Sequence, residues 1–325
     1  MPNYKQLLNK QTISSLPHKE KIQHFFWMGT WSLSGFKYGF SDQRESIKVL
    51  EAAYDIGIRK FDSANFYGNG ESLRLLKKVF GSCLNSIFIS SKGGLIWENG
   101  TVIKSMDPSI LHSDLNKTLE ILETNFIDLY QLHWPLLKSS FSSPYEFFLS
   151  IKEKKVIEHF GLNNLNSEIV LDSLPFLREI YYNFVNQVHY SPLINDRQTV
   201  QLLKNETKCI TIGTGLFEQG FLLPSFKNKK IGKKDIRRSH PLLNNVICEK
   251  WVDSFNEACI PFKLVPEVVL LLWAYFRTEL DGVIIGPRTI MQLSKIKPAF
   301  DLINDPSVDK HLSPLFDFLD TTPVI

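Results

Sequence analysis

The sequence contains few cysteines and no long apolar run. Cys83, Cys209, Cys248 and Cys259 are far apart and form no C-x-x-C pair. We therefore expect no disulfide framework and no structural zinc site. Instead we expect free thiols in a reducing cytoplasm. No apolar run reaches the roughly 18–20 residues that a membrane helix needs, and the polar N-terminus has no signal-peptide core. We expect a cytoplasmic protein that does not contact a membrane.

The chain also carries little net charge. The formal charge of its 325 residues is +3, and 43% of them are hydrophobic and 22% charged. These values are ordinary for a soluble globular protein and give no general case for nucleic acid as a partner. The exception is a basic run over residues 227–238, KNKKIGKKDIRR. We interpret it either as a solvated loop or as part of a ligand site.

Short apolar runs alternate with helix-like segments along most of the chain. The runs are apolar on both faces, which is typical of parallel strands covered by helices. Two of the helix starts are expected at Ser41 and at Asp107, where Pro108 takes the first helical position. The predicted strands lie within residues 25–30, 58–62, 86–92, 126–133, 156–162, 181–188, 208–214 and 280–287.

Eight strand–helix units that fill nearly the whole chain favour one closed (β/α)8 TIM barrel. An open doubly wound sheet is the alternative that the pattern leaves open. We expect a single domain over residues 1–325, with loops and a C-terminal tail over the barrel mouth. The association state expected for it is a monomer or a weak homo-oligomer.

Four polar residues fall at or just after consecutive predicted strands. Asp62, Lys92 and His133 end the second, third and fourth strands, and Tyr67 follows Asp62 in a glycine-flanked turn. In such barrels the catalytic residues lie at the C-terminal ends of the strands. A tyrosine is a weak acid, and a nearby ammonium stabilises its phenolate and lowers its pKa. The four residues together could therefore protonate a carbonyl oxygen while a hydride arrives at carbon.

Each of these residues also has an ordinary structural interpretation. An aspartate at a strand end is often a helix cap, a single lysine is often solvated, and a single histidine is often a hydrogen-bonded core residue. Their occurrence together on successive strand ends favours the catalytic interpretation.

At these residues the sequence resembles the aldo-keto reductase family. GIRKFDSANFYGNGES is similar to the family signature Asp-Thr-Ala-x-x-Tyr-Gly, with Ser63 in place of threonine. IFISSKGG resembles the strand that delivers the family's lysine, and IDLYQLHWP the strand that delivers its histidine. The resemblance implies a catalytic tetrad of Asp62, Tyr67, Lys92 and His133, with Tyr67 as the proton donor.

The resemblance also implies NADPH as cofactor, with NADH less favoured, and a small carbonyl compound as substrate. The chain agrees in having no G-x-G-x-x-G after a strand and no Walker loop. Arg288 suits a 2′-phosphate, because its planar fork matches phosphate oxygens. The cofactor-binding residues implied by the resemblance are Gly29, Thr30, Asn163, Asn164, Gln187, Thr214, Gly286, Arg288 and Gln292.

Several positions depart from the family pattern. Asn163 replaces a serine, and Thr214 stands where many members stack a tyrosine on the nicotinamide. Lys295 and Ile296 replace the Glu–Asn pair that usually holds the adenine amine. The basic run 227–238 lies where members often fold a segment over the cofactor pyrophosphate.

The substrate is less readable than the cofactor. Trp31, Trp97 and Trp134 follow three of the strands and are expected to line the pocket, where aromatic faces suit sugars or apolar aldehydes. The segment from Ile303 to Ile325 is expected to close over the site. Two other functions stay open: a non-catalytic, cofactor-sensing binding protein on the same fold, as in the channel-associated β subunits, and a metal-dependent hydrolase. The predicted strand ends lack the clustered His and Asp ligands that such a hydrolase needs.

Overall fold

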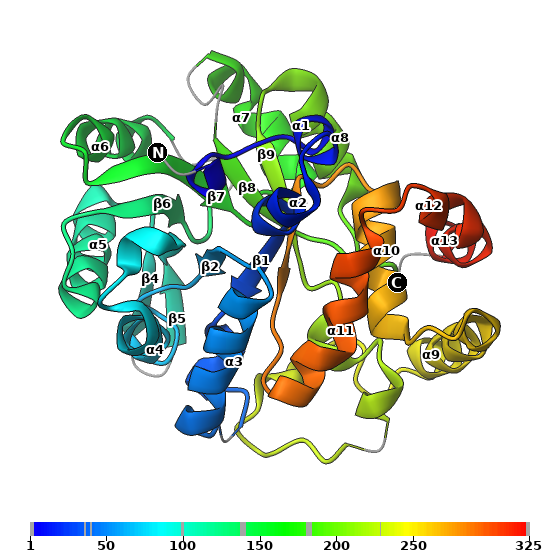
Figure 1. Ribbon diagram of the computed structural model, residues 1–325. Coiled ribbons are helices and arrows are strands. Elements are labelled where there is room, and N and C mark those ends of the chain that lie inside the picture. Colours follow the sequence, from blue (N-terminus) through cyan, green and yellow to red (C-terminus); the bar gives the residue numbers. More distant parts are fainter. Residues whose placement is uncertain are drawn as a thin grey trace.

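Eight parallel strands form a closed barrel in the computed structural model of the protein (Figure 1). This confirms the predicted (β/α)8 barrel. The structure describes residues 3–35, 37–39, 41–98, 101–136, 141–179, 184–227 and 229–322. In their order around the barrel, the strands are β1 (Phe26–Gly29), β10 (Gly282–Ile285), β9 (Ile210–Thr214), β8 (Val185–His189), β7 (Ile157–Asn163), β6 (Ile127–Leu132), β3 (Phe88–Gly93) and β2 (Lys60–Asp62).

Helices follow each strand and cover the outside of the barrel (Figure 1). The strand–helix alternation read from the sequence is therefore present in all eight units. In chain order these helices are α3 (Gln43–Asp55), α4 (Glu71–Phe80), α5 (Pro108–Leu122), α6 (Ser142–Glu153), α7 (Ser167–Glu179), α8 (Arg197–Glu206), α9 (Val246–Cys259), α10 (Pro266–Arg277) and α11 (Ile290–Leu302).

Some elements were not foreseen from the sequence. An antiparallel hairpin follows β3, two short helices precede β1, and two more follow α11. Their bounds are β4 (Leu95–Glu98), β5 (Thr101–Lys104), α1 (Lys10–Ser14), α2 (His18–Phe25), α12 (Ser307–His311) and α13 (Ser313–Asp320).

The helix starts show how local side chains set the element boundaries. As predicted, Asp107 caps α5 by accepting a hydrogen bond from the backbone N–H of Ser109, and Pro108 is the first helical residue. The expected cap of α3 was wrong by one position. Asp42, not Ser41, accepts from the backbone N–H of Arg44.

The interior of the barrel contains a cluster of apolar side chains below the polar strand ends. A separate apolar layer lies between strands and helices, to which α10 contributes nearly all of its residues. Because this packed interior has no room for a substrate, the active site is expected at the ends of the strands. The interior cluster consists of Trp27, Phe88, Leu129, Val185, Ile210 and Ile212.

The C-terminal tail packs on the outside of the barrel. Trp251 of α9 donates a hydrogen bond to Thr322, and Trp273 of α10 donates one to Asp320. These contacts place α12 and α13 beside α9 and α10 (Figure 1). The tail also reaches the start of α8, after β8, where Arg197 donates to the carbonyl of Asp320.

No single helix in the described residues has the length and apolarity to cross a membrane. One bent pair, Val246–Phe262 with Pro266–Arg277, passes the test of length and composition, with an angle of 86° between its two parts.

Candidate active site

The ends of β2, β3 and β6 bring three of the predicted site residues together. β3 pairs with β2 on one side and with β6 on the other, and His133 is the residue directly after β6. The ammonium of Lys92 lies 2.6 Å from Oδ2 of Asp62. All three side chains are buried, so the ion pair is shielded from water.

Tyr67 returns to the same place through the turn after β2. Its backbone N–H donates to the carbonyl of Ala64, and Gly68 and Gly70 take positive φ values of 63° and 84°. A Cβ on Gly70 would lie 2.5 Å from Cδ1 of Ile121, so the turn needs glycine there. The result is a Tyr67 hydroxyl 3.2 Å from the ammonium of Lys92.

Burial sets the protonation of this group of residues. It raises the pKa of Tyr67 well above the usual range, and the charge of Asp62 adds to the effect. This net direction is opposite to the lowering by Lys92 that the sequence led us to expect, because burial raises the pKa and the charge of Lys92 is paired with Asp62. Burial, with the charge of Lys92, lowers the pKa of His133 well below its usual range. Tyr67 is thus a neutral phenol and His133 a neutral imidazole at physiological pH.

A second polar layer beneath the tetrad was not predicted. Oδ1 of Asp62 accepts hydrogen bonds from the hydroxyl of Ser90, 3.0 Å away, and from the amide of Gln187, 2.6 Å away. The Gln187 amide also lies 2.8 Å from Oε1 of Gln131. Ser90 and Gln131 precede Lys92 and His133 by two residues and so share their face of the sheet. That spacing was a readable signal of this layer.

Two aromatic stacks approach the tetrad. The ring of Trp31 is stacked on Tyr67, with 5.5 Å between centroids. Trp97 is stacked on Phe66 at 5.1 Å, and Phe66 meets His133 edge to face. Trp31 and Trp97 therefore lie beside the tetrad, and Phe66 is a neighbouring aromatic residue that the sequence did not reveal. Trp134 lies under the ammonium of Lys104, 3.9 Å from its ring centroid.

Comparison with known proteins decides the family. The sequence model of the aldo/keto reductase family matches residues 26–308. The chain belongs to this family.

Relatives and solved structures agree with this assignment. The chain is 28% identical to the aldo-keto reductase YhdN of Bacillus subtilis over 144 residues, which are 43% of the chain and 43% of that protein. It is 21% identical to the uncharacterized oxidoreductase YrpG of the same organism, over 85% of the chain and 88% of that protein. The alignment with YhdN thus spans less than half of the length of that protein.

The fold is shared with the glycerol dehydrogenase AKR11B4 from Gluconobacter oxydans. That structure superposes with a TM-score of 0.71 at 20% identity, covering 89% of the chain and 91% of the other chain.

Six of the residues that the aldo/keto reductase resemblance assigned to the cofactor lie at strand ends on the tetrad side of the barrel. The Thr30 hydroxyl and backbone N–H both donate to the carbonyl of Asp62. The side chain of Asn164 donates to the carbonyl of His133, and its backbone N–H to the carbonyl of Gln187. The six are Gly29 on β1, Thr30 after it, Asn163 on β7, Asn164 after it, Gln187 on β8 and Thr214 on β9.

The other three cofactor candidates follow β10. Oε1 of Gln292 accepts from the backbone N–H of Arg288, which orders the turn into α11, and a guanidinium N–H of Arg288 donates to the carbonyl of Tyr38. Ser32 donates to the carbonyl of Gly286. This places Gly286, Arg288 and Gln292 beside the loop after β1.

The basic run 227–238 reaches the same place, although its residue 228 lies outside the described residues. The backbone N–H of Ile236 donates to the carbonyl of Lys37, so the long loop after β9 crosses to the loop between β1 and α3 (Figure 1). Arg237 is paired with Asp235 at 2.6 Å. Burial and the charges of Arg237 and Arg288 lower the pKa of Lys229. Arg237 is buried, Arg288 is partly buried and Lys229 is exposed, so these three residues form a partly buried cationic cluster, while most of the basic run is exposed to solvent.

This cationic cluster is the observation that fits the cofactor of the family. Burial and the nearby charge of Arg237 lower the pKa of Arg288 as well, because several cations share one partly buried place. A phosphate group relieves such repulsion and matches the guanidinium fork.

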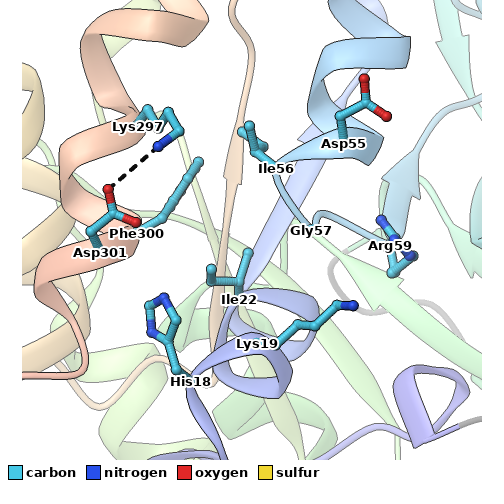
Figure 2. Close-up of a pocket in the computed structure, with 10 residues that line it drawn as sticks. All are labelled: His18, Lys19, Ile22, Asp55, Ile56, Gly57, Arg59, Lys297, Phe300 and Asp301. Carbon is cyan, nitrogen blue, oxygen red and sulfur yellow. Dashed lines mark ion pairs between the residues drawn. The ribbon is translucent and has the colours of Figure 1, made fainter.

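A surface pocket opens elsewhere on the molecule. It lies beside the segments that lead into β1 and β2, at the opposite end of the barrel strands from the tetrad (Figure 2). Its lining mixes both signs of charge, including the pair Lys297–Asp301 at 3.5 Å. It contains no tetrad residue. Within the described ranges, no group of three His, Cys, Asp or Glu side chains is arranged to hold a metal ion.

Proposed function

We propose that the protein is an NADPH-dependent oxidoreductase that reduces an aldehyde or ketone, including sugar-related ones, to an alcohol. The observation that carries the proposal is the buried chain of contacts from Asp62 through Lys92 to the hydroxyl of Tyr67. NADPH, when bound, supplies the hydride. We further propose that residues 1–325 form one domain and that the protein acts in the cytoplasm as a monomer or weak homo-oligomer.

The chain's own residues account for the proton. The raised pKa of Tyr67 keeps its hydroxyl protonated and ready to donate to a carbonyl oxygen. As the proton leaves, the ammonium of Lys92 stabilises the developing phenolate, and Asp62 holds that ammonium in place. His133 has no hydrogen-bond partner for Nδ1 within the described part of the chain, and as a neutral group it can orient the carbonyl.

The preference for NADPH over NADH is supported by the cationic cluster. We assign Arg288 to the 2′-phosphate. Arg237 lies close enough to lower the pKa of Arg288, and both arginines lower the pKa of Lys229. Arg237 and Lys229 are proposed to screen the charge of the pyrophosphate. Gln187 has its amide N–H groups directed at Asp62 and Gln131, which leaves its carbonyl oxygen to accept from a carboxamide.

The substrate is proposed to be small and to lie against aromatic rings. Trp31, Phe66 and Trp97 supply flat apolar faces on two sides of the tetrad. Among relatives, DkgA of Yersinia pestis is named a methylglyoxal reductase, and a Bacillus subtilis relative is named a glyoxal reductase. Small dicarbonyl compounds are therefore suitable first substrates, beside aldoses and simple ketones.

The proposal is tested by following cofactor oxidation with purified protein across aldehydes, dicarbonyls, aldoses and ketones. NADPH should be consumed in the presence of at least one carbonyl class, with NADH consumed more slowly at equal concentration. Tight NADPH binding without turnover on any class would instead favour a cofactor-sensing protein.

A further inference from the structure

A second ionisable cluster lies at the barrel mouth, outside the tetrad. Nε2 of His189 is 2.7 Å from Oε1 of Glu218, and Nε2 of His240 is 3.2 Å from Oε2 of the same carboxylate. Glu218 has no exposed surface, whereas the side chain of His189 is 43% exposed. The cluster is thus a buried carboxylate that orients one imidazole open to solvent.

The backbone is shaped to build this cluster. Glu218 and Gln219 both take left-handed conformations, with φ values of 46° and 55°, which are unfavourable for residues other than glycine. Gly215 also has a positive φ, of 78°, and a Cβ there would lie 2.7 Å from Cε1 of His189. The imidazole is therefore fixed by a glycine face on one side and a carboxylate on the other.

His189 lies close to two of the cofactor candidates, Gln187 and Thr214. It lies two residues after Gln187 on β8, so both side chains are on the same face, and it is further along the strand by roughly 7 Å. Across the sheet its register partner is Thr214 of β9. The cationic cluster around Arg288 lies near β10 and the loop after β1, so His189 stands on the nicotinamide side of the proposed cofactor site.

The charges around His189 favour its protonated form. Burial lowers the pKa of His189, but the hydrogen bond and charge of Glu218 outweigh it, so the net pKa is raised. Burial raises the pKa of Glu218, but its contacts with His189 at 2.7 Å and with His240 at 3.2 Å outweigh burial, so the net pKa is lowered. Two other ionisable groups lie near this pair: the imidazole of His240, and the thiol of Cys248, whose pKa is raised by burial and by the charge of Glu218.

We propose that His189, oriented by Glu218, is a positioning residue that donates a hydrogen bond to a phosphate oxygen on the nicotinamide half of the cofactor. This inference rests on the proposed function. It gives the anionic cofactor a second anchor, distinct from the 2′-phosphate anchor at Arg288. It also couples cofactor affinity to pH, because imidazolium attracts phosphate oxygens and neutral imidazole does not.

The test is a tryptophan-fluorescence titration of the full chain with NADH between pH 6 and pH 9. NADH is used because it lacks the 2′-phosphate, whose own ionisation near pH 6 would overlap with that of the histidine. The wild-type dissociation constant should rise roughly tenfold or more across this range, as expected for the loss of one charge-assisted hydrogen bond. His189→Gln should bind about tenfold more weakly at pH 6 and show a flat profile.

Three controls separate the outcomes. His159→Gln makes the same substitution on neighbouring β7, where burial lowers the histidine pKa to about 4, so this variant should behave like wild type. Glu218→Gln should shift the midpoint of the NADH profile to lower pH. Adenosine 2′,5′-bisphosphate, which lacks the nicotinamide half, should bind wild type and His189→Gln equally, which also reports an intact fold.

An unchanged affinity and pH profile in His189→Gln would overturn the inference while leaving the proposed function standing. A wild-type protein that binds neither NADH nor NADPH would overturn both.

Discussion

The Lys92–Asp62 ion pair makes a sharp prediction about stability. The side chain of Lys92 has no exposed surface, and its ammonium contacts Asp62 at 2.6 Å and the carbonyl of Ser63 and hydroxyl of Tyr67 at 3.2 Å each. Lys92→Met keeps most of the aliphatic volume and leaves Asp62 without its counter-charge. Breaking a buried pair in this way costs about 3–5 kcal/mol. Because Ser90 and Gln187 still donate to Asp62, we expect a value near the lower end, about 3 kcal/mol.

The assay is urea unfolding at neutral pH, with Asp62→Asn and the double variant measured in parallel. If the loss comes from an uncompensated charge, the double variant should be more stable than Lys92→Met alone.

Two results would refute this reasoning. One is a loss below about 1 kcal/mol for Lys92→Met, which is the range of an exposed ion pair. The other is a double variant that is no more stable than the single one.

Three further outcomes follow from the same contacts. Arg288→Ala should bring the dissociation constants for NADPH and NADH closer together by roughly tenfold or more, since one charge-assisted contact to the 2′-phosphate is lost; an equal loss for both cofactors in a fluorescence titration would place Arg288 elsewhere. Lys60 is buried with a pKa lowered to about 7, so the unfolded state binds more protons between pH 7 and about 10, and unfolding free energy should rise with pH there; Lys60→Met should remove that slope in urea titrations at several pH values. In Lys92→Met the developing phenolate of Tyr67 loses the ammonium that stabilises it, so the reduction rate should fall by a similar factor across the neutral and alkaline range, because Tyr67 stays protonated in both proteins; a reduction rate equal to that of wild type would rule out this role of Lys92.

Much of the fold could be predicted because its signals are local or periodic. Apolar runs mark the strands, and Asp107 followed by Pro108 marks a helix start. The convergence of Asp62, Lys92 and His133 also followed, since consecutive parallel strands place their ends side by side. The start of α3 was missed by one residue because Ser41 and Asp42 are both good caps, and backbone geometry chose between them.

Other features depend on tertiary packing, which local sequence patterns do not predict. The contact between His189 and Glu218 joins the end of β8 to the turn after β9, 29 residues further along the chain, and needs left-handed backbone at Glu218. The net pKa of Tyr67 was predicted in the wrong direction because burial, which the sequence does not reveal, outweighs one compensated ammonium. The path of the tail depends on contacts of Phe318 and Asp320 with Trp251 of α9 and Trp273 of α10.

The account's central claim is that Tyr67 gives the proton to the substrate carbonyl, and one variant tests it directly. Tyr67→Phe removes the hydroxyl beside Lys92 and keeps the ring that stacks on Trp31. On a carbonyl compound that the wild type reduces, turnover should fall by roughly 10²–10⁴-fold or more, while the NADPH dissociation constant stays nearly unchanged. Tyr54→Phe, on α3, serves as the matched control and should keep wild-type turnover. A Tyr67→Phe protein with near wild-type turnover would show that another group supplies the proton.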